Sequence, residues 1–114
     1  MEAKEILKVI ELTAENRAPG FNVNIKWEQM EAMEKLNEGL LEKLPNRIQR
    51  KLGKKEGYYF EYRNSEPLTA KQLQTAREIM RKHYEERLGC QVRITKKCYG
   101  ACEGGYDIFY PEAR

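Results

Sequence analysis

Apolar residues recur along the chain with two periods, one typical of helices and one typical of strands. Residues 28–44 place their apolar side chains on one stripe at helical spacing, and a proline follows directly. Residues 3–15 show the same spacing but also an alternation that fits a strand. Residues 46–52 predict a second, shorter helix, which Gly53 ends because glycine adopts the left-handed conformation of a helix stop.

The strongest helix prediction covers residues 70–88. Leu73, Ala76, Met80, Tyr84 and Leu88 share one face of that helix. The helix begins with a capping box, in which Thr69 and Gln72 satisfy each other's backbone amides, and Gly89 supplies the stop.

Alternating apolar and polar residues predict four strands. They cover residues 21–27, 58–63, 92–95 and 106–110. The last two strands are joined by a glycine-rich segment, which predicts a hairpin. We therefore expect an α+β fold in which a helical N-terminal half precedes a β-α-β-β arrangement. Its mainly antiparallel sheet would carry the helices on one face, and residues 1–114 would form a single domain.

Composition excludes several classes of protein. The chain has 114 residues, no apolar run of the roughly 18 residues that a membrane span needs, and no pattern typical of a secretory signal. Its three cysteines do not suggest a disulfide framework, so we expect a reducing, cytoplasmic location. Nucleotide-binding glycine loops and zinc-protease motifs are absent from the sequence, which favours a non-enzymatic protein without a cofactor.

The net charge of +3 hides two basic blocks. Residues 46–57 carry five basic and one acidic side chain, and residues 76–97 carry seven basic and three acidic ones. Both ends of the chain are acidic. Clustered Lys and Arg attract a polyanion more effectively than the same charge spread evenly, so the blocks indicate a phosphate-binding face.

The residues expected to contact phosphate are the cations without an obvious local partner. They are Arg47, Arg50, Lys51, Lys54, Lys55, Arg93, Lys96 and Lys97. If Ile108 and Tyr110 face the helices, Phe109 lies on the outer face beside Arg93, and Tyr59 is a second candidate for that face. An aromatic ring next to cations is what an unpaired base and its phosphate require.

A plain solvated surface is the competing interpretation of these charges. Along residues 70–88, acidic and basic side chains recur four positions apart, for example Arg81 and Glu85, and can neutralise each other. Arg93, Lys96 and Lys97 have no such neighbours in the sequence.

An acidic stripe suggests a different partner. Glu34, Glu38 and Glu42 recur four positions apart on the helix predicted over residues 28–44, where like charges repel. The stripe could meet a basic protein, as in small inhibitors or adaptors of phages and mobile elements, or it could simply be solvated.

Three cysteines and the single histidine lie close together in the sequence. Cys90, Cys98, Cys102 and His83 provide the ligand types of a structural zinc site, and Cys98 and Cys102 have a permitted spacing. A disulfide between Cys98 and Cys102 and three inert thiols are the alternatives, and inert thiols are favoured.

The sequence therefore predicts a binding module without catalytic activity. The preferred partner is nucleic acid or a nucleic-acid-processing protein, held by the basic face. The alternatives are an inhibitor or adaptor that uses the acidic helix and a zinc-stabilised module.

Overall fold

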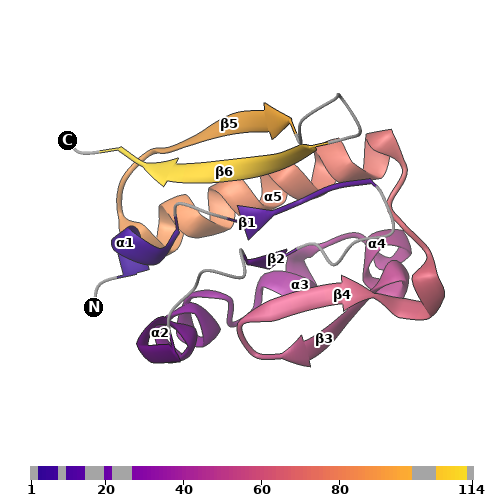
Figure 1. Cartoon of the computed structure of the whole chain (residues 1–114), viewed down its shortest axis with the longest axis horizontal. Helices are drawn as coiled ribbons and strands as arrows, with labels where there is room; N and C mark the ends of the chain where they lie inside the picture. The colour runs from indigo at the N-terminus through magenta and orange to yellow at the C-terminus, as the bar shows by residue number, and fades with distance from the viewer. Residues whose placement is uncertain (1–2, 8–9, 15–19, 22–26, 99–104, 113–114) are drawn as a thin grey trace.

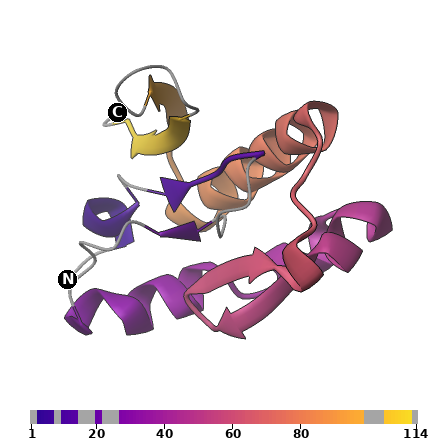
Figure 2. The same ribbon diagram turned by 45° about the vertical axis from the view of Figure 1, so that its right-hand side comes forward.

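A long central helix organises the molecule. In the computed structural model the described residues are 3–7, 10–14, 20–21, 27–98 and 105–112. Helix α5 (Ala70–Leu88) runs behind the strands, and β1 (Ile10–Glu11) and β2 (Gly20–Phe21) lie between two longer antiparallel pairs (Figures 1 and 2). The pair β5 (Val92–Cys98) and β6 (Gly105–Pro111) lies on one side of β1 and β2, and the pair β3 (Leu52–Glu56) and β4 (Tyr59–Tyr62) lies on the other.

The other elements are short. They are α1 (Ala3–Ile6), β1 (Ile10–Glu11), β2 (Gly20–Phe21), α2 (Trp27–Leu36), α3 (Leu40–Lys43), α4 (Asn46–Lys51) and the 3-10 turn η1 (Arg63–Ser65). Helices and antiparallel strands occur together, which confirms the predicted α+β class. Within the described residues, the strands form three two-stranded pairs, β1–β2, β3–β4 and β5–β6, rather than one continuous sheet.

The local signals around α5 are confirmed. The Thr69 side chain accepts a hydrogen bond from the Gln72 amide at 3.2 Å, and the Gln72 side chain accepts one from the Thr69 amide at 3.1 Å. Gly89 ends the helix with φ of 68°. Among the described residues, α5 and every other helix lack the length or the apolar content that a membrane span requires.

The single helix predicted over residues 28–44 is divided into α2 and α3. Gly39 adopts a left-handed conformation with φ of 80°, which costs glycine little. The side chain of Asn37 is buried beside this turn, where it accepts a hydrogen bond from the Tyr84 hydroxyl at 2.9 Å and donates one to the Tyr58 carbonyl at 3.2 Å. A buried amide needs such partners, so tertiary contacts fix the break.

The structure differs from the sequence-based expectation in three further segments. Residues 3–15 do not form one helix, because α1 ends at Ile6 and β1 follows at Ile10. The strand predicted over residues 21–27 is described only at Phe21 in β2 and at Trp27, which begins α2; residues 22–26 lie outside the described ranges. Strand β3 was not predicted. Its polar residues show no alternation, and it forms by pairing with β4.

Two connected clusters of buried residues hold the fold together. The larger one lies around Met80, Tyr84 and Phe109, and the smaller one consists of Leu44, Ile48, Leu52, Leu68 and Ala76. Leu41, Leu73 and Ile79 pack against both clusters and join them. Burial of the smaller cluster fixes α4 and β3 on α5 through the hydrophobic effect.

Candidate functional site

Helix α4 presents cations to solvent because a single apolar residue anchors it. Ile48 is 2% exposed and belongs to the smaller core cluster, whereas Arg47 and Arg50 are exposed. Arg47 and Arg50 are three positions apart, so they are neighbours on the helix surface. The Gln49 side chain donates to the Leu44 carbonyl at 2.6 Å and ties the start of α4 to the end of α3.

The β3–β4 pair adds lysines and a tyrosine next to α4. Gly53 is opposite Glu61 in the ladder, and Lys55 forms an ion pair with Glu61 at 3.6 Å. A hydrogen bond with Tyr59 and the charge of Glu61 raise the pKa of Lys55 above its ordinary value. The structure thus brings together Tyr59 and Lys55, two of the residues expected to bind nucleic acid. Tyr59 is half-buried, and its ring lies 5.1 Å from that of Tyr58.

Arg63 joins this surface although the sequence did not single it out. Its side chain crosses β3 at Gly53, where a Cβ atom would lie 3.1 Å from Nε and 3.2 Å from Cγ of Arg63. Gly53 therefore permits the close approach of Arg63 to the strand. The sequence signal that could have identified this contact is a glycine within a basic strand.

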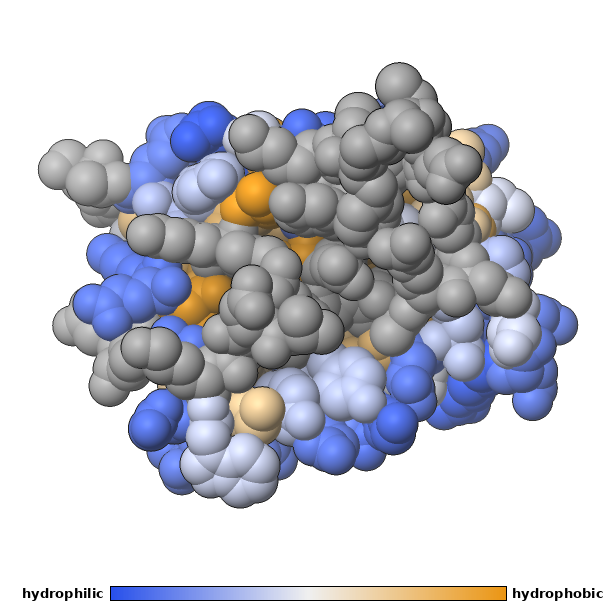
Figure 3. Space-filling view, viewed as in Figure 1, coloured by the Kyte–Doolittle hydropathy of each residue, from blue (hydrophilic) through white to orange (hydrophobic). Residues whose placement is uncertain are grey.

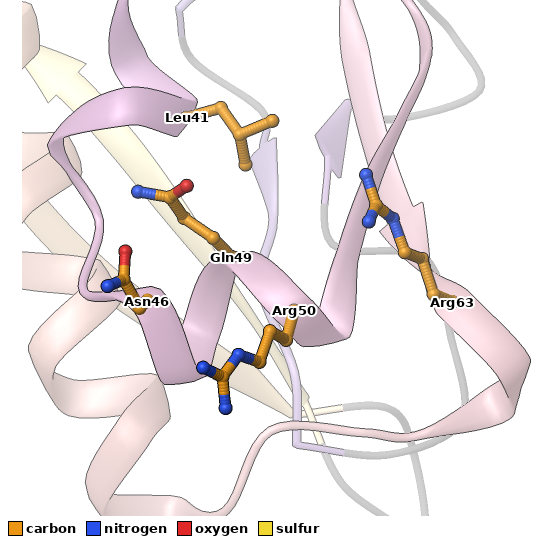
Figure 4. Close-up of a pocket in the computed structure, with 5 residues that line it drawn as sticks. All are labelled: Leu41, Asn46, Gln49, Arg50 and Arg63. Atoms are coloured by element: carbon orange, nitrogen blue, oxygen red, sulfur yellow. The ribbon is translucent and has the colours of Figure 1, made fainter.

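Arg63 and Arg50 flank a shallow pocket of about 210 Å³ that Leu41, Asn46 and Gln49 complete (Figure 4). A neighbouring hollow of about 350 Å³ is lined by Lys54 and Lys55 together with Arg63. Arg63 is shared by the two hollows, so the cations of α4, β3 and η1 form one continuous surface. We call Arg47, Arg50, Lys54, Lys55 and Arg63 the basic face.

The basic face is poorly neutralised. Among the described residues, Lys55 is its one member with a carboxylate oxygen within 4 Å, namely that of Glu61. Hydrophilic side chains predominate along the lower edge of the molecule, where β3 and β4 lie (Figure 3). Lys51, predicted to contact phosphate, has a structural role, because its ammonium donates to the Pro67 carbonyl at 3.1 Å and to the Gln72 side chain at 2.8 Å.

The second basic block does not join the basic face. Its cations in residues 77–87 lie on α5, and Arg93, Lys96 and Lys97 lie on β5, at the opposite edge of the molecule from β3 and β4 (Figures 1 and 2). Arg93 has no partner nearby in the sequence but gains partners through the fold, because its guanidinium lies 3.4 Å from the Glu112 carboxylate and 4.7 Å from the centre of the Tyr110 ring. Lys96 is exposed. Lys97 is opposite Tyr106 in the β5–β6 ladder, and the structure describes its backbone but not its side chain.

Phe109 is not a stacking platform. It is completely buried, and its ring meets that of Tyr84 edge-on at 5.7 Å. The ladder pairs Phe109 with Ile94 and Tyr110 with Arg93, so the predicted facing of β6 was wrong. Ile108 on the opposite face of β6 is also buried, and alternation cannot identify the inner face of a strand that is covered on both sides.

The acidic stripe is divided in the same way as its helix. Glu34 lies on α2, Glu38 in the turn that contains Gly39, and Glu42 on α3. Glu34 packs over Gly57 in the β3–β4 turn, where a Cβ atom would collide with its side chain. The three carboxylates therefore do not form one continuous helical stripe.

The predicted metal ligands are only partly described. The His83 Nε2 atom lies 2.7 Å from the Leu36 carbonyl oxygen, and its Nδ1 atom is buried without a hydrogen-bond partner. Burial is the largest effect on this imidazole and lowers its pKa. Cys90 is a buried free thiol. The described ranges contain no group of three potential metal ligands, and Cys102 and the Cys98 side chain lie outside them, so the zinc site stays a prediction.

Comparisons with protein-family models, with curated proteins and with solved structures found no match to this chain.

Proposed function

We propose that the chain is a non-enzymatic binding module that holds the phosphate backbone of nucleic acid on its basic face. The observation that carries this proposal is that two hollows share Arg63 from η1, with Arg50 from α4 lining one of them and Lys54 from β3 lining the other. None of these three cations has a carboxylate within 4 Å in the described part of the chain.

Phosphate binding suits this arrangement for two reasons. Each cation that neutralises a phosphate releases a condensed counterion, and the gain in entropy drives association. Each guanidinium group, that of Arg50 and that of Arg63, can also donate two parallel hydrogen bonds to a phosphate. A cation already paired within the fold would first have to lose its partner, so unpaired cations are the stronger candidates.

Tyr59 favours unpaired nucleotides over a regular duplex. Its half-buried ring is held next to Lys55 on the hairpin, so a base stacking on it would have a cation near its phosphate. Stacking of one base on an aromatic side chain is worth about 1–3 kcal/mol and tolerates any sequence. The proposal therefore includes a preference for single-stranded over double-stranded nucleic acid of equal length.

The test compares two double variants that remove equal charge. Fluorescence anisotropy of labelled single- and double-stranded oligonucleotides would measure the dissociation constant at low salt. We expect Arg50→Gln with Arg63→Gln to weaken binding at least tenfold. Arg93→Gln with Lys96→Gln, at the opposite edge of the molecule, should change the constant less than about twofold, because the lost cations lie off the proposed surface.

Two outcomes would overturn the proposal. One is that neither oligonucleotide binds to the wild-type chain at low salt. The other is that the two double variants weaken binding equally, because net charge rather than the basic face would then explain the attraction.

A further inference from the structure

A third hollow, of opposite charge, lies between α2 and the turn of the β3–β4 hairpin. It has a volume of about 360 Å³, within the range of small ligand-binding pockets, about 300–1,000 Å³. It is lined by Trp27, Glu28, Met30, Glu31, Glu34, Glu56 and Tyr58. We call this surface the acidic groove. It combines aromatic rings with carboxylates from two separate elements.

Trp27 is the most unusual residue of the acidic groove. It is the only tryptophan of the sequence, and 83% of its surface is exposed although it could be buried favourably. Trp27, Glu31 and Glu34 are spaced by four and three positions, so they follow one another along a single face of α2. The indole ring of Trp27 and the carboxylates of Glu31 and Glu34 therefore line the same hollow.

The carboxylates of the acidic groove lack an ion-pair partner within the described ranges. Among the described residues, no Lys or Arg nitrogen lies within 4 Å of Glu31, Glu34 or Glu56. Glu28 is favoured by its position in the first turn of α2, where the helix dipole attracts negative charge, and Glu56 has a hydrogen bond with Tyr58, whereas Glu31 and Glu34 lie beyond that first turn. Their mutual repulsion is relieved when a cation binds between them.

Tyr58 adds a second aromatic surface. A hydrogen bond with Glu56 is the main cause that raises the pKa of Tyr58 to about 12. Glu34 also packs against Gly57 of the same turn, which holds the hairpin and α2 together at the groove.

The chemistry of the groove points to an organic cation. No set of three carboxylates among the described residues is close enough to hold a metal ion, so the groove does not suit a small, hard cation. The groove does suit a guanidinium or ammonium group on an apolar stem, because it combines carboxylates with aromatic rings. Its charge would lie between Glu31 and Glu34, and it would attract the electron-rich face of Trp27, the best cation–π partner among the aromatic residues.

We propose that the acidic groove binds an arginine- or lysine-rich segment of a partner protein, with one basic side chain against Trp27 and its charge between Glu31, Glu34 and Glu56. Arginine is the better fit, because its planar guanidinium stacks on indole and donates to two carboxylates at once. This function is separate from that of the basic face. A chain with both surfaces would join nucleic acid to a basic protein.

Trp27 makes the proposal directly measurable. Because it is the only tryptophan, selective excitation reports on the groove alone. A hexa-arginine peptide should change its emission in a saturable way, and a hexa-glutamate peptide should not. Glu31→Gln with Glu34→Gln should raise the dissociation constant at least tenfold. Glu38→Gln with Glu42→Gln removes the same charge outside the groove and should change it less than twofold.

Each alternative outcome overturns the assignment. No saturable change with hexa-arginine, or equal weakening by both double variants, would leave only unspecific attraction. Self-association of the chain that the Glu31→Gln, Glu34→Gln variant abolishes in sedimentation would make a second copy the occupant. Trp27→Ala, followed by calorimetry, should weaken hexa-arginine binding, and unchanged affinity would contradict the role of the indole. Arg50→Gln with Arg63→Gln should leave peptide binding intact, which separates this proposal from the proposed function.

Discussion

The two longer strand pairs use similar charged residues in opposite ways. On the β5–β6 side, three arginines are engaged within the fold. Arg77 lies 2.9 Å from the buried Asp107, Arg81 pairs with Glu78 and Glu85, and Arg93 pairs with Glu112. The β3–β4 side is different, because Arg50, Lys54 and Arg63 have no carboxylate within 4 Å in the described residues.

A cluster of cations in the sequence therefore does not by itself give a surface on which those cations are free to bind a ligand. Residues 46–57 and 76–97 have the same net charge. What separates them is where the fold brings carboxylates: Asp107 and Glu112 come from β6 and the residue after it, whereas β4 supplies one glutamate, Glu61. Predictions that test this contrast compare matched positions on the two sides.

The largest difference is expected for the two aromatic residues that the sequence proposed for stacking. Phe109→Ala removes a completely buried ring and should lower the free energy of unfolding by about 3–5 kcal/mol. Tyr59→Ala removes a half-buried ring on the hairpin and should cost about 1 kcal/mol or less. Urea denaturation measures both, and equal losses would contradict the assignment of Phe109 to the core and Tyr59 to the surface.

The second contrast concerns two ion pairs. The Asp107 side chain is 2% exposed, so Asp107→Asn leaves the Arg77 guanidinium with a weakened partner in a partly buried site and should cost about 2–3 kcal/mol. The Glu61 side chain is 38% exposed, and Glu61→Gln should cost at most about 1 kcal/mol. Chemical denaturation in low and high salt checks this, because salt should reduce the contribution of Glu61 more than that of Asp107.

A third prediction concerns His83, which joins α5 to the end of α2. Burial lowers its pKa below the ordinary 6.5, and the positive charges of Lys43 and Arg87 act in the same direction. The unfolded chain therefore binds a proton more readily than the folded chain. The resulting stability is present above about pH 6.5 and is lost as the pH falls through that value.

The free energy of unfolding should accordingly be lower at pH 5.5 than at pH 7.5, with a shallower dependence in His83→Gln. Glu78 and Glu86 do not complicate this range, because their pKa values lie below the ordinary 4.5. A wild-type curve that is flat over this range would show that the imidazole is not held neutral.

Local signals explain which parts of the fold could be predicted. The α5 boundaries were correct because the capping box and Gly89 act within a few residues of the helix ends. The break at Gly39 was missed because it depends on hydrogen bonds of Asn37 with Tyr58 and Tyr84, which are distant in the sequence. Strand β3 was missed because its pairing with β4, not its own pattern, makes it a strand.

The candidate site was predictable only where it is contiguous in sequence. Arg50, Lys54 and Lys55 were found by their local density of charge. Arg63 was not, since it reaches the basic face from η1 by crossing Gly53. The partners of Arg93 could not be found either, because Glu112 and Tyr110 meet it only through the register of β5 and β6.

The salt dependence of oligonucleotide binding tests the central contrast most directly. For the wild-type chain, the logarithm of the association constant should fall linearly with the logarithm of salt concentration. Arg50→Gln with Arg63→Gln should reduce the slope by about 2, one for each lost phosphate contact, and Arg93→Gln with Lys96→Gln should leave it unchanged. Equal reductions for the two pairs would contradict the account, because both edges of the molecule would then carry available charge.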